Sequence, residues 1–458
     1  MPLQLSALSN QRSELSKPAS AGVLFTLHPS LFTPSMDAAK SLSAVTVDSD
    51  YDPNSMPVAK AREYIRAFLT PITTVERLHI RAALGRVLAE DVRSTMNVPA
   101  NDNSAMDGYA VRFADLTPSA DVTLKVVGSS FAGRPFEGSV AGGQAVRIMT
   151  GGVIPSGCDT VIMQERVKVA DGNVIVPGSQ QQGQNVRRAG DDIRQGATVF
   201  KRGQIVRPAE LGMIASLGIG EVSVYRKLRV AFFSTGDELV PIGGTLGPGQ
   251  LYDSNRYTIY GMLTRLGVEA IDMGSIRDDP AAIETAFLEA ARAADVVITS
   301  GGVSVGEADF VKQLLAKLGD VLFWKIAMKP GRPLAYGKIG AAHFFGLPGN
   351  PVSAMVTFYQ FVREAMLVLM GVPEPAPLPM LKAICTSAIK KAPGRTEFQR
   401  GILSQGTDGQ WTVRVTGDQG SGILSSMSQA NCFIVLPDAQ GNTPAGAMVD
   451  VQILAGLI

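Results

Sequence analysis

Hydrophobic positions in residues 227–372 follow two alternating patterns. Short runs of β-branched and aromatic residues, as at 229–234 and 296–299, predict buried strands. Segments with apolar residues at helical spacing separate these runs; after the second run the spacing is carried by Val311, Leu314, Leu315 and Leu318. This alternation predicts an α/β domain with a doubly wound parallel sheet and right-handed crossovers.

The same region contains three further strand-like runs and several helix starts. The runs lie at 321–328, 333–339 and 342–347. Three helices are predicted to begin at Asn255, at Asp279–Pro280 and at Pro351, because these residues are favoured at N-caps and first turns.

The flanking segments have different patterns. Residues 57–69 and 74–90 each read as an amphipathic helix, and residues 185–226 contain a short helix with glycine stops. Residues 98–184 consist of short β-rich runs cut by turn residues, including an Asp-Gly hairpin turn. We therefore predict a multidomain α/β plus β protein in which a small all-β domain is inserted into a helical linker domain.

The predicted domain limits follow from these changes in pattern. They are a flexible N-terminal extension at 1–54, a discontinuous linker domain at 55–97 and 185–226, an inserted β domain at 98–184, the α/β domain at 227–372, and a C-terminal small β barrel or sandwich at 373–458. The last domain begins in a proline-rich linker.

Composition narrows the functional classes. The net charge of +1 gives no sign of the basic surface that nucleic-acid binding requires. The longest apolar run, near 355–372, is interrupted by Arg363 and Glu364, so no membrane span is expected. Three scattered cysteines favour reduced thiols and a cytoplasmic location. With only three histidines, the chemistry is expected to rest on carboxylates, Lys, Arg, Ser and backbone amides.

A glycine-rich loop at 300–306 joins a predicted strand to a predicted helix. Its glycines allow close approach to a ligand, and the following helix N-terminus favours an anion. Glu307 and Asp309 lie in the same turn, which is typical of a divalent cation next to a phosphate. The alternative is a structural turn whose acidic residues are favoured by the helix dipole.

Four other unusual loops are predicted to lie at the same edge of the sheet, beyond the carboxyl ends of its strands. They occupy 234–238, 277–280, 328–333 and 346–353. Together the loops bring acids, two cations, hydroxyls and exposed amides to one place. Acids suit a metal, and cations and amides suit oxyanions.

These loops also carry a resemblance. The motifs TSGGVSVGEAD, KPGRP, GLPGNPVS, STGDEL, SAMDGYA and GDQGSGILSS, in this arrangement, resemble the molybdopterin molybdenumtransferase family of the MoeA and gephyrin E-domain type. The resemblance covers about 55–458. The TSGG-type loop alone is less specific, since it recurs in molybdopterin adenylyltransferases, which resemble only the α/β domain.

The resemblance implies the final step of molybdenum cofactor synthesis, in which adenylylated molybdopterin and molybdate give molybdenum cofactor and AMP. A divalent cation, expected to be Mg²⁺, would bridge the phosphates. The implied metal ligands are Asp278, Asp309 and Glu238, and the implied catalytic residues are Asp107, Asp192, Glu238 and Asp309. The implied substrate-binding residues are Thr150, Ser300, Gly301, Gly302, Ser304, Lys325, Lys329, Pro348, Pro351, Ser353, Arg400 and Ser421.

Within this set, four residues are candidates for holding molybdate without a competing carboxylate: Lys329, Ser353, Arg400 and Ser421. Lys325 is the candidate for a phosphate contact. Arg400 has the alternative of a surface arginine on a barrel strand. Arg332 occupies a position where the family frequently has lysine, so its geometry differs while the charge is retained.

The resemblance also implies a homodimer whose active site is shared between subunits, which would explain why Asp107, Thr150 and Asp192 lie far from the α/β domain in sequence. The alternatives are a turn residue for Asp107 and a strand-end hydroxyl for Thr150. A transient contact with the adenylyltransferase that supplies the substrate is also expected.

Two rival classes remain at this point. An adenylyltransferase would make the adenylylated pterin, but it would not need the β domain, SAMDGYA or the C-terminal domain. A non-enzymatic receptor scaffold would not need the acids at the sheet edge. The sequence does not distinguish molybdate from tungstate or assign a role to residues 1–54.

Overall fold

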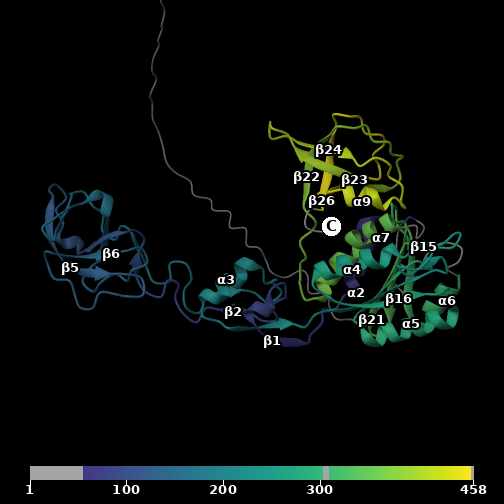
Figure 1. Ribbon diagram of the computed structural model, residues 1–458, viewed down its shortest axis with the longest axis horizontal. Coiled ribbons are helices and arrows are strands. Elements are labelled where there is room, and N and C mark those ends of the chain that lie inside the picture. The colour runs from purple at the N-terminus through teal and green to yellow at the C-terminus, as the bar shows by residue number, and fades with distance from the viewer. Residues whose placement is uncertain (1–54, 303–308, 455–458) are drawn as a thin grey trace, which may run out of the picture. The chain divides into compact units, whose positions relative to one another are not determined.

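The computed structural model describes residues 55–302 and 309–454, all within one compact unit, Leu42–Ile458. The predicted extension at 1–54, Ser304 and Glu307 therefore lie outside the described residues. Figure 1 shows the order of the elements along the chain, with the central sheet and its helices in teal and green and the C-terminal strands in yellow.

A six-stranded sheet forms the centre of the α/β domain. Its order is β16 (Glu269–Ile276), β13 (Arg229–Thr235), β17 (Val296–Ser300), β21 (Ala342–Leu347), β20 (Pro333–Ile339) and β18 (Gly319–Lys325). The first four strands are parallel, whereas β20 runs antiparallel to both of its neighbours. The connections on either side of β20 are too short for a crossover helix, so they form reversals instead.

Both faces of this sheet are covered, which confirms the doubly wound architecture. Along β13, Val230 and Phe232 pack in a core with α4 (Ser254–Leu266) and the last helix of the domain. The alternate residues Ala231 and Phe233 pack in a second core with α5 (Pro280–Ala293) and α6 (Asp309–Leu318). Alternation places successive side chains on opposite faces, and full burial of one such side chain contributes roughly 1.5–3 kcal/mol.

The last helix of the domain begins at Pro351, as predicted. It consists of α7 (Pro351–Thr357), a π-helical segment η4 (Phe358–Val362) and α8 (Arg363–Leu369). Among the described residues, this is the single helix whose length and apolar character would suit a membrane span. Of its apolar 18-residue stretch, 89% is buried inside the protein. Core packing therefore accounts for its apolar sequence.

The linker segments form small antiparallel pairs around one core. β1 (Val75–His79) pairs with β12 (Glu221–Tyr225), and β2 (Val92–Arg93) pairs with β11 (Thr198–Phe200). Their shared core unites buried residues from both sides of the insertion, including Leu88, Val92, Val206, Ile214 and Val222. The short helix of this region is α3 (Pro208–Ser216).

The two helices predicted near the start of the described chain have different outcomes. The first is confirmed as α2 (Val58–Phe68). The helix predicted at 74–90 is wrong: this segment is β1 followed by the short 3-10 helix η1 (Ile80–Ala83). Pairing with β12, which is distant in sequence, satisfies the β1 backbone and overrides the local helical pattern.

The segment at 98–184 contains a second six-stranded sheet and only 3-10 turns as helix. The sheet order is β7 (Thr160–Met163), β4 (Gly108–Val111), β6 (Gln144–Ile148), β5 (Val122–Ser130), β9 (Asn173–Val176) and β8 (Lys168–Ala170). Asp171 and Gly172, with φ of 49° and 76°, form the predicted Asp-Gly hairpin turn. The domain is thus all-β in its regular structure, as predicted.

The C-terminal segment is a closed barrel, which resolves the choice between barrel and sandwich. Its strands are β23 (Thr396–Gln405), β24 (Trp411–Val415), β22 (Met380–Cys385), β26 (Met448–Ile453) and β25 (Cys432–Leu436), and a β23–β25 pairing closes the ring. The short helix α9 (Leu424–Gln429) follows β24. A two-residue strand of the α/β domain, β19 (Met328–Lys329), adds to β23.

Candidate active site

The predicted convergence of loops occurs at one edge of the α/β sheet. β18 is parallel to β21 through the intervening β20, so its carboxyl end lies at the same edge as those of β13, β16, β17 and β21. The loop between β18 and β20 therefore joins the loops that follow the parallel strands. In an open α/β sheet this edge is the usual ligand-binding position.

One side-chain amide ties two of these loops to the start of α4. Asn255 Nδ2 donates to Ser300 Oγ at 2.7 Å and to the Gly349 carbonyl at 2.6 Å. Gly301 N donates to the Leu347 carbonyl at 3.2 Å, and Ser300 Oγ lies 3.5 Å from the Pro348 carbonyl. The predicted residues Ser300, Gly301 and Pro348 thus meet at one point.

The glycines of the loop are required by close backbone approach. Gly301 has a φ of +94°, and a Cβ there would lie 2.6 Å from the Thr235 carbonyl oxygen. Gly302 has a φ of +67°, and a Cβ there would lie 3.1 Å from Thr235 Oγ1. Any side chain at these positions would push the 234–238 loop away from the glycine loop.

Two buried polar atoms beside these glycines lack partners. Among the described residues, neither Thr235 Oγ1 nor Asn255 Oδ1 has a hydrogen-bond partner. Buried polar atoms in native proteins are normally satisfied. We therefore expect a ligand, or residues outside the described ranges, to complete their hydrogen bonds.

Four carboxylates lie in the loops after β13 and β16: Asp237, Glu238, Asp278 and Asp279. Asp278 N donates to Asp237 Oδ1 at 3.3 Å. The Glu238 carboxylate folds over Gly236, where a Cβ would come within 2.4 Å of Oε2. The described part of the chain contains no group of three or more His, Cys, Asp or Glu able to hold a metal alone. Asp309 begins α6, but its side chain lies outside the described part.

The KPGRP loop faces both the barrel and the last helix. Lys329 is half exposed, and its Nζ lies 3.5 Å from the buried Glu397 carboxylate. Gln399 Nε2 donates to the other oxygen of Glu397 at 2.8 Å. Glu397 therefore gives Lys329 a carboxylate neighbour, which the sequence analysis did not anticipate. Lys325 ends β18, and its carbonyl accepts from Met56 N.

Gly331 in this loop has a φ of +92°, and a Cβ there would lie 2.6 Å from Thr357 Oγ1 and 3.3 Å from the Ser353 carbonyl. The loop therefore packs directly on the first turns of α7. Pro351 is the first residue of α7 and Ser353, 5% exposed, follows it. The predicted residues Lys329, Pro351 and Ser353 are thereby brought to the same end of one helix.

Arg400 is buried, which excludes the alternative of a surface arginine. It is 1% exposed, its Nε donates to Ser426 Oγ at 2.9 Å, and its Nη2 donates to the Gly420 carbonyl at 2.9 Å. Burial lowers the pKa of Arg400 to about 10, with Asp418 acting in the opposite direction. The residue stays charged at neutral pH and holds the barrel loop that contains Gly420.

The same barrel loop contacts the helix at the sheet edge. The Ser421 carbonyl accepts a hydrogen bond from Val352 N at 3.1 Å. Arg400 is thus linked to the start of α7 through Gly420 and Ser421.

Asp107 and Thr150 form a separate pair in the β domain. Asp107 Oδ1 accepts from Thr150 N and from Thr150 Oγ1, both at 2.7 Å. The backbone hydrogen bond, the hydroxyl and nearby Arg147 hold the pKa of Asp107 below its usual range. An exposed carboxylate fixed in its ionised form can act on a ligand presented to this surface.

Asp192 lies near a different part of the linker region. Its side chain is exposed, and its N donates to the Val98 carbonyl at 3.0 Å. Among the residues that the structure describes, no hydrogen bond or ion pair joins Asp107, Thr150 or Asp192 to the edge of the α/β sheet.

Sequence reasoning missed three residues of this edge: Thr235, Asp253 and Glu397. It also assigned Asn255 to helix capping, whereas the observed cap of α4 is Asp253, which accepts from Arg256 N at 3.2 Å. Asp253 is buried and also accepts from Ser234 and Ser275 hydroxyls. All three residues of the Asp-Ser-Asn sequence are suited to capping, and only tertiary contacts distinguish them.

Family comparisons agree with this arrangement. The MoeA N-terminal region (domain I and II) matches 56–218, a probable molybdopterin binding domain matches 231–367, and the MoeA C-terminal region (domain IV) matches 382–454. The three matched regions follow one another in the order of the observed β, α/β and barrel segments.

Individual relatives extend the match over most of the chain. The chain is 50% identical over 381 residues to a molybdopterin molybdenumtransferase of Haemophilus influenzae, covering 83% of this chain and 94% of the relative. It is 37% identical to one from Nostoc sp., covering 83% and 88%. A crystal structure of a molybdopterin biosynthesis MoeA protein from Pyrococcus horikoshii matches with a TM-score of 0.76 at 30% identity, covering 87% of this chain and 100% of that one.

The fold and the loop edge thus define a molybdopterin-binding type of α/β domain joined to MoeA-type flanking domains. The chain belongs to the molybdopterin molybdenumtransferase family.

Proposed function

We propose that the protein is a transferase that inserts molybdenum from molybdate into adenylylated molybdopterin, releasing AMP and molybdenum cofactor. Family membership over most of the chain supports the activity. One observation supports the location of the site: the loops of Thr235, Ser300 and Gly349 meet around buried polar atoms that have no hydrogen-bond partner among the described residues. Such a site suits the phosphoanhydride of the adenylylated pterin.

The acids of the same edge suit a magnesium ion. Mg²⁺ is usually held by one or two carboxylates together with substrate phosphates and water, so a complete protein cage is not required. Asp278 and Glu238 lie in adjacent loops of the described structure, and Asp309 begins α6 after the glycine-rich loop. When bound, the ion would neutralise charge on the phosphates, and these carboxylates would orient it.

Molybdate is proposed to bind where the KPGRP loop, α7 and the barrel meet. Lys329, Ser353 and Ser421 come from these three elements, and each is tied to the others by a backbone or loop contact. A tetrahedral dianion needs positive charge and donors, which Lys329 and the start of α7 supply. Glu397 would restrain Lys329 until the anion displaces that contact.

We propose that the active unit is a homodimer with a shared site. The ionised Asp107 with Thr150 has no link within the chain to the sheet edge among the described residues. A second subunit would bring this pair, and Asp192, to the substrate. The free cysteines, two of them buried, favour a cytoplasmic location, where transient contact with the adenylyltransferase would deliver the substrate.

The proposed reaction is tested by a coupled assay. The purified protein is incubated with adenylylated molybdopterin and molybdate, and an apo-molybdoenzyme is then added. Activation of that enzyme that depends on both reagents supports the transferase. Failure to activate it, together with production of adenylylated pterin and pyrophosphate from ATP and molybdopterin, would assign the chain to the adenylyltransferase class instead.

A further inference from the structure

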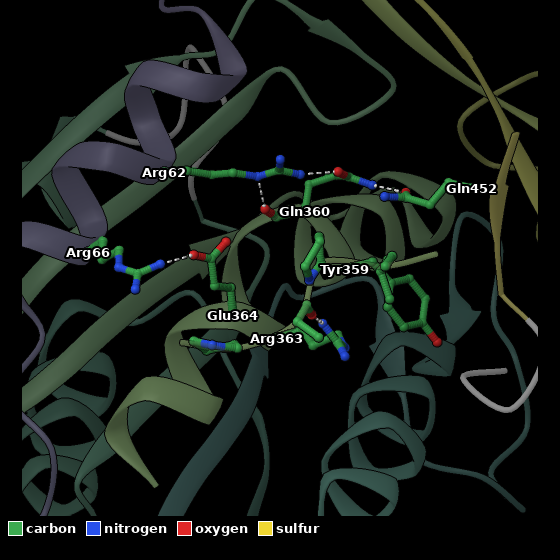
Figure 2. Close-up of a pocket in the computed structure, with 11 residues that line it drawn as sticks. Arg62, Arg66, Tyr359, Gln360, Arg363, Glu364 and Gln452 are labelled. Carbon is green, nitrogen blue, oxygen red and sulfur yellow. Dashed lines mark hydrogen bonds and ion pairs between the residues drawn. The ribbon is translucent and has the colours of Figure 1, made fainter. Parts of the chain in front are cut away.

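A cavity of about 250 Å³ lies away from the sheet edge, between α2, the last helix of the α/β domain, the 373–378 linker and β26. Figure 2 shows the side chains around it. The last helix of the α/β domain starts with Pro351 at the sheet edge, and Arg363 lies twelve residues later in the same helix. Twelve residues span about 18 Å along a helix axis. The cavity is therefore distinct from the candidate active site.

The charged residues that line this cavity are mostly cationic. They are Arg62, Arg66, Arg363 and Glu364. Arg66 pairs with Glu364 at 3.3 Å, so the one carboxylate is already engaged. In the described structure, neither Arg62 nor Arg363 forms an ion pair with a carboxylate. The lining thus carries an excess of two positive charges.

The partners of the two unpaired arginines are neutral. Arg62 donates to the Gln360 carbonyl at 2.7 Å and to the Gln360 side chain, which in turn donates to Gln452 (Figure 2). Arg363 Nη1 reaches the Ala376 carbonyl at 3.4 Å, and its buried Nε has no hydrogen-bond partner among the described residues. Burial lowers the pKa of both arginines, opposed by Glu364.

Arg62 and Arg363 are partly buried, and guanidinium groups withdrawn from water are normally paired with anions, because desolvation of an unpaired charge is costly. Arg62 and Arg363 come from different helices, and the π-helical segment Phe358–Val362 lies directly before Arg363. Such π segments occur frequently at functional sites. An anion between the two arginines would offset the charge excess of the lining.

We propose that this cavity binds a small tetrahedral oxyanion of the phosphate class through Arg62, Arg363 and Arg66. Guanidinium forks suit the paired oxygens of such an anion, and the volume admits the anion with accompanying water. The bound anion would link α2 and the last helix of the α/β domain to the linker that leads into the barrel. This inference does not depend on the proposed reaction.

Isothermal titration of the full-length protein with inorganic phosphate, at constant ionic strength, tests the proposal. We expect Arg363→Gln and Arg66→Gln each to weaken phosphate binding by roughly tenfold to hundredfold, as loss of one charge-assisted contact predicts. The matched control is Arg77→Gln, which removes an exposed arginine paired with Glu221 and should leave affinity unchanged. Arg66 is half exposed, so its variant tests the site even if Arg363→Gln fails to fold.

Three further outcomes would overturn the assignment. Unchanged phosphate affinity in Arg66→Gln shows that the cavity is not the phosphate site. Equal or tighter binding of malonate than of phosphate contradicts a tetrahedral ligand. Crystals soaked in selenate give the position directly: an anomalous peak between Arg62 and Arg363 supports the proposal, and a peak only at the sheet edge rejects it.

Discussion

Asn255 and Ser300 are joined by a 2.7 Å hydrogen bond that links the start of α4 to the end of β17. The same amide holds the Gly349 carbonyl, so one side chain sets the spacing of the loops around the proposed phosphate site. Both contacts connect segments far apart in sequence.

Replacing Asn255 should therefore disturb the site more than the fold. We expect Asn255→Ala to lower AMP release at least tenfold, and to reduce the free energy of unfolding by about 1–3 kcal/mol because two hydrogen bonds are lost. Turnover and urea unfolding measure the two effects. Thr264→Ala is the control, because Thr264 lies on the same helix and its hydroxyl donates to the Tyr260 carbonyl one turn earlier. Comparable losses in both variants would refute a specific role for Asn255.

Arg400 is expected to position the barrel loop rather than contact molybdate. Arg400→Ala should raise the molybdate concentration for half-maximal turnover, because Gly420 and Ser421 lose their anchor beside α7. It should also destabilise the protein by about 2–4 kcal/mol, since it leaves a cavity and buried polar groups without partners.

The matched control for this prediction is Arg414→Ala, which removes an exposed arginine from neighbouring β24. A molybdate titration of both variants gives the comparison. An unchanged half-saturation point in Arg400→Ala, with binding of the pterin substrate also unchanged, would remove Arg400 from the anion site altogether.

His343 should make stability depend on pH. Burial, together with Lys338, lowers its pKa from 6.5 to about 4, and its Nδ1 lies 3.3 Å from Tyr336 Oη. The folded protein resists protonation of His343, whereas the unfolded chain takes up a proton below about pH 6.5. The contribution of neutral His343 to the free energy of unfolding is therefore present above pH 6.5 and is lost as the pH falls towards 4. The loss is about 3 kcal/mol by linkage.

Denaturant unfolding of wild type and His343→Gln between pH 7 and 4 measures this contribution. The variant should show a shallower decline of unfolding free energy on acidification than the wild type. Parallel curves for wild type and His343→Gln would contradict the assignment.

The shared site predicts complementation between two inactive variants. Asp107→Ala and Asp309→Ala, mixed in equal amounts and allowed to exchange subunits, should recover about a quarter of wild-type activity, because half of the dimers then carry one intact site. Mass spectrometry of differently labelled subunits verifies the exchange. An inactive mixture after complete exchange would show that each subunit builds its own site.

Sequence patterns predicted the α/β sheet because β13 and β17 are short, continuous apolar runs and the helices between the strands have strong start signals, such as Asp279 followed by Pro280. They failed at 74–90, where β1 depends on pairing with β12, distant in sequence. Local propensity contains no information about that partner.

The residues of the candidate site were likewise predictable from sequence only in part. Motif residues such as Ser300 and Gly301 were found because glycine loops after strands are recognisable locally. Glu397 and Asp253 were missed because their roles depend on contacts with Lys329 and with two serines from other strands. The neutral surroundings of Arg62 and Arg363 likewise exist only in the folded chain.

The most direct test of the central claim is AMP release from adenylylated molybdopterin, measured with and without molybdate in the presence of Mg²⁺. We predict rapid release that requires molybdate in the wild type, and a loss of several orders of magnitude in Asp309→Ala with unchanged thermal unfolding. AMP release that is independent of molybdate, or near wild-type turnover of Asp309→Ala at saturating Mg²⁺, would contradict the proposed reaction and its assigned metal site.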